Sequence, residues 1–187
     1  MKKYCKFLIL LTAALMFTTS CSKDDDNHLE RWMIENQNAI NAIKADPDYK
    51  ELKSPGNEGS IYYKVINKGE GKDSIYYTST VQCYFKGWLV ADYPEFNNTK
   101  KGHIFNQNLF DDGPPYTTNV GTDVISGLKT AMQHMVAGDK WEIWIPYQLG
   151  HGRDGYFDTS ANKKITPGYS TLVYELEIVN VKGIDDI

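Results

Sequence analysis

The chain has 187 residues, of which 41% are apolar and only 7 are proline, enough for one folded domain with a hydrophobic core. The formal net charge of −4 and the lack of a basic stripe argue against a nucleic-acid partner. Thirteen tyrosines favour a β-rich architecture.

The first 20 residues have the pattern of a secretory signal peptide. Three lysines precede an apolar run over residues 7–17, and small residues lead to Cys21. The run is too short to span a membrane. The pattern resembles a bacterial lipoprotein signal, which implies that residues 1–20 are removed and that Cys21 is lipidated. A secreted protein that is cut at another position is the alternative.

Residues 21–28 are interpreted as an acidic tether, because three aspartates closely follow Cys21. The run also resembles the surface-export signal of Bacteroidetes lipoproteins. We therefore expect an outer-membrane lipoprotein that faces either the periplasm or the cell surface. Removal of residues 1–20 changes the formal net charge from −4 to −7. It leaves Cys83 as the one thiol without lipid, so we expect no intramolecular disulfide and a Cys83 packed in a strand.

Residues 29–53 are predicted to be an N-terminal helical segment. The helix is expected to end before Asp46–Pro47, and Asn36 interrupts its apolar face. The helix either packs on its own domain or serves self-association. The apolar positions on that face are Leu29, Trp32, Met33, Ile40 and Ile43.

Residues 57–187 are interpreted as one domain that begins within a turn-rich linker, residues 54–59. Alternation of apolar and polar residues predicts strands over 61–66, 81–89 and 170–181, with a short strand that ends at 120–121. In the strand 81–89, this alternation places Val81, Cys83 and Phe85 on one face. Gln82, Tyr84 and Lys86 are placed on the other. Two polar segments, 91–108 and 153–168, are predicted to be long loops.

One helix interrupts these strands, within residues 123–152. Ser126 is the expected N-cap of a helix of about three turns, and Gly138 its C′ residue, where positive φ costs glycine little. A strand follows, in which apolar residues occupy every second position, and it ends at Pro146. The fold class is therefore α+β: an antiparallel sheet with one short helix on a face, preceded by an N-terminal helix.

Four ordered segments carry a resemblance to a known family. They are residues 62–71, 81–87, 123–152 and 170–178, which read YYKVINKGEG, VQCYFKG, DVISGL…MVAGDK…IPYQLGHG and STLVYELEI. In this order and spacing, residues 59–181 resemble the FK506-binding-protein (FKBP) family of peptidyl-prolyl isomerases.

The resemblance implies isomerisation of X–Pro bonds in exported proteins. The barrier, about 18–20 kcal/mol, arises because amide resonance must be broken, and no covalent step is required. An apolar aromatic cavity can favour the twisted amide over the planar one while a backbone N–H holds the substrate carbonyl. The implied partners are proline-containing polypeptides and the membrane, with neither cofactor nor metal.

The family's pocket carries over onto particular positions of this chain. The implied catalytic residues are Tyr84, Phe105, Asn106, Ile125, His151 and Tyr174, with Ile125 supplying the N–H. The implied substrate-binding residues are Tyr116, Val124, Leu128 and Thr166. Four of these depart from the family: Asn106 replaces an aspartate, Leu128 a tryptophan, His151 a tyrosine and Thr166 an isoleucine.

Two further functions stay open beside the isomerase. One is a non-catalytic peptide-binding or chaperone lipoprotein on the same scaffold, which the departures in the pocket favour. The other, with least support, is a metal site formed by His103, His134 and His151.

Overall fold

The computed structural model describes residues 23–90, 101–110 and 113–182. The chain divides into two compact units, Met1–Arg31 and Trp32–Ile187. In the first unit the structure describes only the beginning of helix α2 (Lys23–Ala45). The predicted signal peptide and Cys21 lie outside the described residues. Within the described ranges, no helix is long and apolar enough to cross a membrane.

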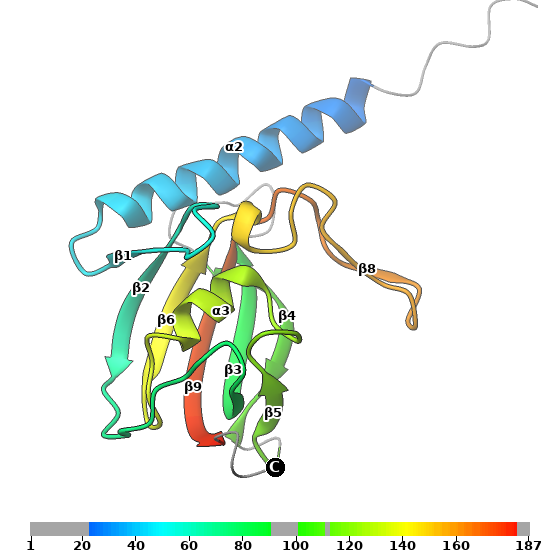
Figure 1. The fold of residues 1–187 in the computed structure, drawn as a ribbon. Helices are drawn as coiled ribbons and strands as arrows, with labels where there is room; N and C mark the ends of the chain where they lie inside the picture. Colours follow the sequence, from blue (N-terminus) through cyan, green and yellow to red (C-terminus); the bar gives the residue numbers. More distant parts are fainter. Residues whose placement is uncertain (1–22, 91–100, 111–112, 183–187) are drawn as a thin grey trace, which may run out of the picture. The chain divides into compact units, whose positions relative to one another are not determined.

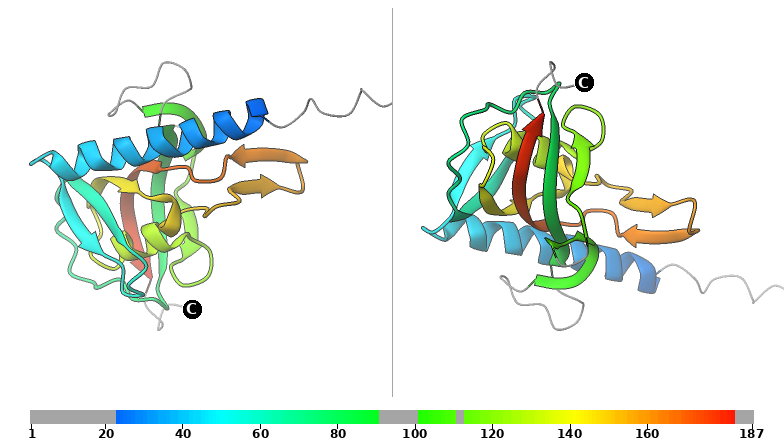
Figure 2. Two further views of the ribbon diagram at one scale, coloured as in Figure 1. Left: turned by 90° about the horizontal axis from the view of Figure 1, so that it is seen from above. Right: turned by 90° about the horizontal axis from the view of Figure 1, so that it is seen from below.

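The second unit is built on a seven-stranded antiparallel sheet (Figures 1 and 2). Six strands run in the order β1-β2-β6-β9-β3-β4, and β5 also pairs with β3. Two further strands form a separate hairpin, β7–β8. The bounds are β1 Lys50–Lys53, β2 Ser60–Asn67, β3 Thr80–Val90, β4 Lys101–Asn108, β5 Tyr116–Asn119, α3 Ser126–Met132, β6 Lys140–Ile145, the 3-10 turn η2 Tyr147–Leu149, β7 Tyr156–Asp158, β8 Lys163–Thr166 and β9 Leu172–Lys182.

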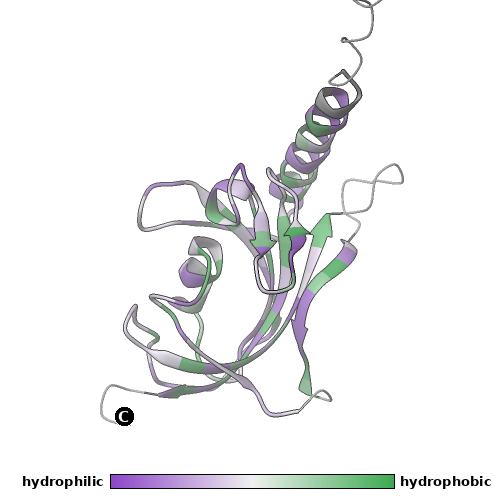
Figure 3. Ribbon diagram, turned by 90° about the vertical axis from the view of Figure 1, so that its right-hand side faces the viewer, coloured by the Kyte–Doolittle hydropathy of each residue, from purple (hydrophilic) through white to green (hydrophobic). Residues whose placement is uncertain are grey.

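Strand register sends alternate side chains to opposite faces of this sheet. One cross-strand row joins Tyr63, Ile143, Tyr174 and Gly87. The neighbouring row joins Tyr62, Trp144, Val173 and Trp88. Figure 3 shows the resulting interleaving of hydrophobic and hydrophilic segments along the curved strands, with the short helix α3 inside the curve.

The first face packs against α3 and forms the larger core. Leu128, Ala131 and Met132 of the helix are buried against Ile143 and Ile145 of β6. Gly127 permits this close approach, because a Cβ there would stand 2.3 Å from Ile145 Cγ2. The helix therefore lies directly on the sheet.

The opposite face packs against residues 32–45 of α2. Ala39, Ile40 and Ile43 join the row of Tyr62, Trp144 and Val173 in a second buried cluster. Residues 32–45 of the N-terminal helix therefore pack on their own domain. Asn36, expected to weaken the apolar stripe, is 2% exposed and fully engaged. Its Oδ1 accepts from the Thr171 N–H at 2.6 Å, and its Nδ2 donates to Trp32 O at 2.8 Å.

The prediction for the short helix was wrong at both ends. Its N-cap is Ile125, with φ −63° and ψ 154°, and Ser126 is the first helical residue. The helix ends at Met132, giving two turns rather than three. Gly138 does have positive φ, +89°, but it lies in the turn beyond the helix. Asp139 holds that turn, because its carboxylate accepts from the backbone N–H groups of Gly69 and Val136, each at 2.8 Å.

Three other segments differ from expectation. Residues 23–28, expected in the tether, belong to α2, and residues 50–53 of the predicted helical segment form β1. The predicted loop 91–108 contains strand β4, which pairs with β3 despite its polar sequence. The predicted loop 153–168 contains the β7–β8 hairpin. In each case strand pairing or helix extension supplies stability that local composition did not indicate.

Candidate functional site

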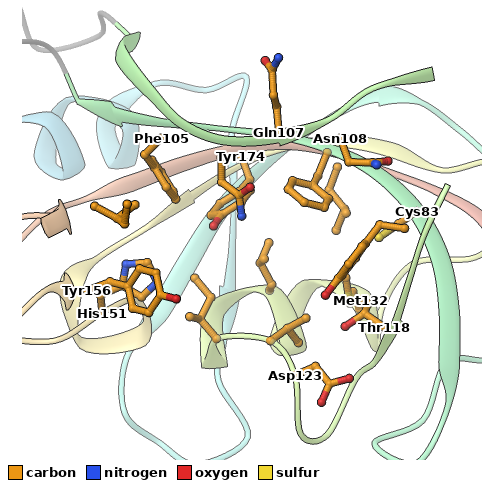
Figure 4. A pocket seen from close by; sticks show the side chains of 18 of the residues that line it. Cys83, Phe105, Gln107, Asn108, Thr118, Asp123, Met132, His151, Tyr156 and Tyr174 are labelled. Carbon is orange, nitrogen blue, oxygen red and sulfur yellow. The ribbon is translucent and has the colours of Figure 1, made fainter. Parts of the chain in front are cut away.

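One open cavity of about 830 Å³ lies between the sheet and α3 (Figure 4). Residues from β3, β4, β5, α3, β9 and the β7–β8 hairpin line it. Its walls contain eight of the ten predicted pocket residues, namely Phe105, Asn106, Tyr116, Val124, Ile125, Leu128, His151 and Tyr174. Six of the eight are aromatic or branched apolar side chains, namely Phe105, Tyr116, Tyr174, Val124, Ile125 and Leu128.

Phe105 and Tyr174 form an aromatic wall at the centre of this surface. Their rings meet edge to face, with centroids 5.5 Å apart and planes at 90°. Gly87 of β3 makes room for both, since a Cβ there would stand 2.9 Å from Phe105 Cζ and 3.0 Å from Tyr174 Cε1. Burial raises the pKa of the Tyr174 hydroxyl well above its usual value, so the group remains neutral.

His151 closes one end of the cavity, beside Tyr156 (Figure 4). Its ring lies 5.2 Å from the Tyr156 ring and 6.2 Å from that of Phe105. The His151 Nδ1 is 2.8 Å from Thr166 Oγ1. Burial lowers the pKa of His151 below its ordinary value, so the imidazole is neutral at pH 7.

Ile125 presents its backbone at the start of α3. As N-cap it has extended backbone geometry, and its carbonyl accepts from the Lys129 N–H at 3.0 Å. Within the described ranges, no residue accepts a hydrogen bond from the Ile125 N–H. This donor therefore stays available to a carbonyl group in the cavity.

The end of the cavity away from His151 is partly polar. Cys83, Thr118 and Met132 lie together there (Figure 4). Burial raises the pKa of the Cys83 thiol to about 12, so it behaves as a small apolar group, and it forms no disulfide. Leu128, 8% exposed, forms the floor beside them. A leucine is smaller than the tryptophan expected from the family, which leaves room down to Met132.

Two predicted pocket residues do not line the cavity. Tyr84 points to the other face of β3, where its hydroxyl donates to Gly113 O at 3.2 Å and its ring contacts Phe110. Its neighbour Phe85 lines the cavity instead, edge to face with Tyr116. The alternation along residues 81–86 already placed Phe85 and Tyr84 on opposite faces of the strand. The sequence therefore indicated that the two side chains could not both point into the cavity.

Thr166 is the second of these, and it is fully buried behind His151. The adjacent residue, Ile165, lines the cavity. Tyr156 and Asp158 were missed because residues 153–168 read as a loop. Met132 and Leu176 also line the cavity, and no local pattern distinguishes core from cavity wall.

The three histidines of the proposed metal site have separate surroundings. His103 lies on β4, His134 Nδ1 is 3.0 Å from Thr130 O, and His151 contacts Thr166. Among the residues that the structure describes, no three His, Cys, Asp or Glu side chains are placed to hold a metal ion.

With the cavity defined, comparison with known proteins identifies the family. Residues 71–179 match the family model of the FKBP-type peptidyl-prolyl cis-trans isomerases. This chain belongs to that family.

Relatives and solved structures agree with this membership. The FKBP-type chain is 25% identical over 184 residues to the macrophage infectivity potentiator of Trypanosoma cruzi, covering 96% of this chain and 82% of the relative. It is 29% identical to the outer membrane protein MIP of Legionella longbeachae, covering 76% of this chain and 51% of the relative. A crystal structure of a peptidyl-prolyl isomerase from Pseudomonas syringae pv. tomato superposes with a TM-score of 0.62 at 26% identity, covering 82% of this chain and 96% of that one. The protein is an isomerase of the FKBP type.

Proposed function

We propose that the cavity between α3 and the sheet is the prolyl-isomerase site of this FKBP-type enzyme. The observation that carries the proposal is the convergence of Phe105, Tyr174, Ile125 and His151 on one open cavity. These residues come from four separate segments of the chain. Ordinary core packing would not leave an accessible cavity between them.

Each group has a role that suits the twisted amide. The prolyl ring lies against Phe105 and Tyr174, in surroundings of low polarity that favour the amide after conjugation is lost. The Ile125 N–H donates to the substrate carbonyl, and the neutral His151 offers a second polar contact. Tyr116, Val124 and Leu128 complete the apolar surface. No proton is transferred and no bond is broken.

The substrates are proline-containing segments of exported polypeptides. Uncatalysed isomerisation takes tens to hundreds of seconds, so a catalyst outside the cytoplasm has an evident use. The name of the Legionella relative, an outer membrane protein, supports a location in the cell envelope. We further propose that residues 1–20 are a lipoprotein signal, that Cys21 carries lipid, and that residues 57–187 form the catalytic domain. Lipidation is tested by incorporation of labelled palmitate, which Cys21→Ser should abolish.

A proline-isomerisation assay on the chain without its first 22 residues tests the enzyme. We expect kcat/KM well above background with a peptide that contains one X–Pro bond. Binding of the peptide without acceleration would instead support the non-catalytic peptide-binding function. The observations that favour that alternative are the small floor at Leu128 and the exposed amide of Asn106 in place of a carboxylate.

Ile125→Pro tests the proposed donor at a position whose φ suits proline. The φ of Ile125, −63°, is the value that a proline ring imposes, so the ring fits this angle while the substitution removes the N–H and shortens the side chain. We expect at least about a tenfold loss of kcat/KM. Ile125→Val keeps the N–H and is the matched control, and circular dichroism checks the fold. Activity unchanged in Ile125→Pro would rule out this donor.

Leu128→Trp tests the position of the prolyl ring. A larger aromatic floor should raise the affinity for prolyl peptides, because it adds apolar contact beneath the ring. Affinity is measured by calorimetry with the wild type beside the variant. Unchanged affinity would contradict the placement of the ring above α3.

A further inference from the structure

Thr166 and His151, two of the positions at which this chain departs from the family pattern, contact each other. The Thr166 Oγ1 lies 2.8 Å from His151 Nδ1, although 15 residues separate them. The same oxygen accepts from the backbone N–H of Tyr156 at 3.1 Å. The Thr166 side chain is fully buried, so water cannot supply further partners.

The donors and acceptors around this hydroxyl fix the direction of each hydrogen bond. A backbone N–H can only donate, so Tyr156 donates to the Thr166 oxygen. The hydroxyl proton then has one acceptor among the described residues, His151 Nδ1. Nδ1 must therefore be unprotonated, and the ring proton of a neutral imidazole resides on Nε2. With the opposite tautomer, two donors would face Thr166 Oγ1 and its own proton would be buried without an acceptor.

The position of His151 is also held from its backbone. Gly152, with φ +69°, donates its N–H to Tyr147 O at 2.9 Å and accepts from the Tyr169 N–H at 3.0 Å. The imidazole itself lines the cavity. Burial keeps the pKa of His151 low, which favours the neutral ring that this arrangement requires.

We propose that Thr166 is a positioning residue that fixes the Nε2–H tautomer of His151, so that the imidazole serves as a hydrogen-bond donor toward substrate in the cavity. The two substitutions then act as one unit, in which the threonine hydroxyl orients the donor that the histidine supplies. Thr166 itself does not touch substrate.

The tautomer can be measured directly, without reference to activity. Long-range ¹H–¹⁵N correlation spectra of the full chain, kept in detergent and labelled with ¹⁵N-histidine, distinguish the two forms. The chain has four histidines, and His151→Tyr assigns the signals of His151 by their disappearance. We expect Nε2–H in the wild type, a mixed or reversed tautomer in Thr166→Val, and restoration in Thr166→Ser. A wild-type Nδ1–H form, or no change in Thr166→Val, would overturn the proposal.

Thr171→Val provides a matched control. Thr171 is also a buried threonine, and its hydroxyl donates to Asn36 O at 3.2 Å on the α2 face. The variant therefore loses one buried hydrogen bond, but not one to His151. Its His151 tautomer should equal that of the wild type. A tautomer change as large as in Thr166→Val would mean that general loosening, not the hydroxyl, is responsible.

The effect on catalysis rests on the proposed isomerase function. Thr166→Val should lower kcat/KM about three- to tenfold, whereas Thr166→Ser should stay within about twofold of the wild type. In a His151→Tyr background, Thr166→Val should change kcat/KM less than about twofold, because no imidazole remains to orient. An equal loss in both backgrounds would show that Thr166 acts only through Tyr156 and the hairpin, against the proposal. A wild type without isomerase activity would remove the proposed function, while the tautomer would still decide the role of Thr166.

Discussion

On the α2 face of the sheet, Tyr62, Trp144 and Val173 are all buried under the helix, whereas on the α3 face Tyr174 of the neighbouring row lines an open cavity. The same strands supply both rows. Both faces carry aromatic residues, but the α3 face has Gly87 and Leu128 where larger side chains would fill the space. Both faces thus contribute buried core, and the α3 face also keeps a cavity open.

Two polar groups, one on each face, differ in how many hydrogen-bond partners they have. Glu142, on the α2 face, accepts from Tyr49 at 2.5 Å and Trp144 at 2.8 Å, and it pairs with Lys101 at 2.7 Å. Burial alone would raise the pKa of Glu142, but these three partners hold it below its usual value. On the α3 face, the Thr118 hydroxyl is buried without a partner among the described residues. Glu142 is thus held by three partners under α2, whereas the Thr118 hydroxyl at the cavity has none among the described residues.

The largest expected effect is on the closed face. Trp144→Ala should lower the free energy of unfolding by about 3–5 kcal/mol, because it opens a cavity among fully buried side chains. Denaturant unfolding measures the change. Tyr76→Ala, at a position that is 65% exposed, should change it by less than about 0.5 kcal/mol. Folded Trp144→Ala should keep its isomerase activity, and a selective loss of activity would break the contrast between the faces.

Asn36→Leu separates hydrophobicity from hydrogen bonding on the same face. The apolar stripe alone suggests stabilisation, but the variant leaves the buried Thr171 N–H without its acceptor. We therefore expect a loss of about 1–3 kcal/mol in the free energy of unfolding. The control is Asn38→Leu, at an exposed position of α2. A gain in stability for Asn36→Leu would mean that the bond to Thr171 contributes little.

Gly87→Ala should affect the open face selectively. The new Cβ would displace the Phe105 and Tyr174 rings that it meets at 2.9 and 3.0 Å. We expect kcat/KM to fall about tenfold, corresponding to about 1.4 kcal/mol, with a smaller change in stability because the side chains can move. Gly56→Ala, which meets only the Glu58 side chain at 3.4 Å, is the matched control. Full activity in Gly87→Ala would place substrate away from these rings.

The smallest expected effect is the pH dependence contributed by His151. Because burial lowers its pKa in the folded state, the unfolded chain binds the proton first as the pH falls below the ordinary value of 6.5. Stability should therefore decrease on acidification from pH 6.5 down to the lowered pKa. Thermal unfolding across this range measures it, and His151→Tyr should remove this part of the dependence. An identical pH profile in the variant would show that other groups cause it.

Much of the architecture followed from local patterns. Alternation located β2, β3 and β9, helical spacing located α2 and α3, and Gly138 was recognised as a residue with positive φ. These features depend on residues a few positions apart, and their physical causes are steric and periodic. The ordered motifs also indicated the family, and eight of the ten residues proposed from them line the cavity.

Tertiary structure decided what depends on partners that are distant in the chain. Strand β4 exists because β3 pairs with its polar sequence, and Asn36 is buried because Thr171, 135 residues away, bonds to it. Tyr84 was placed in the pocket by resemblance, although the pleat of β3 turns Phe85 inward instead. The sequence by itself determined strands β2, β3 and β9 and the existence, though not the ends, of helices α2 and α3. Only the tertiary structure brings Thr166 to His151, because a hydrogen bond between a loop and a hairpin produces no periodic pattern in the sequence.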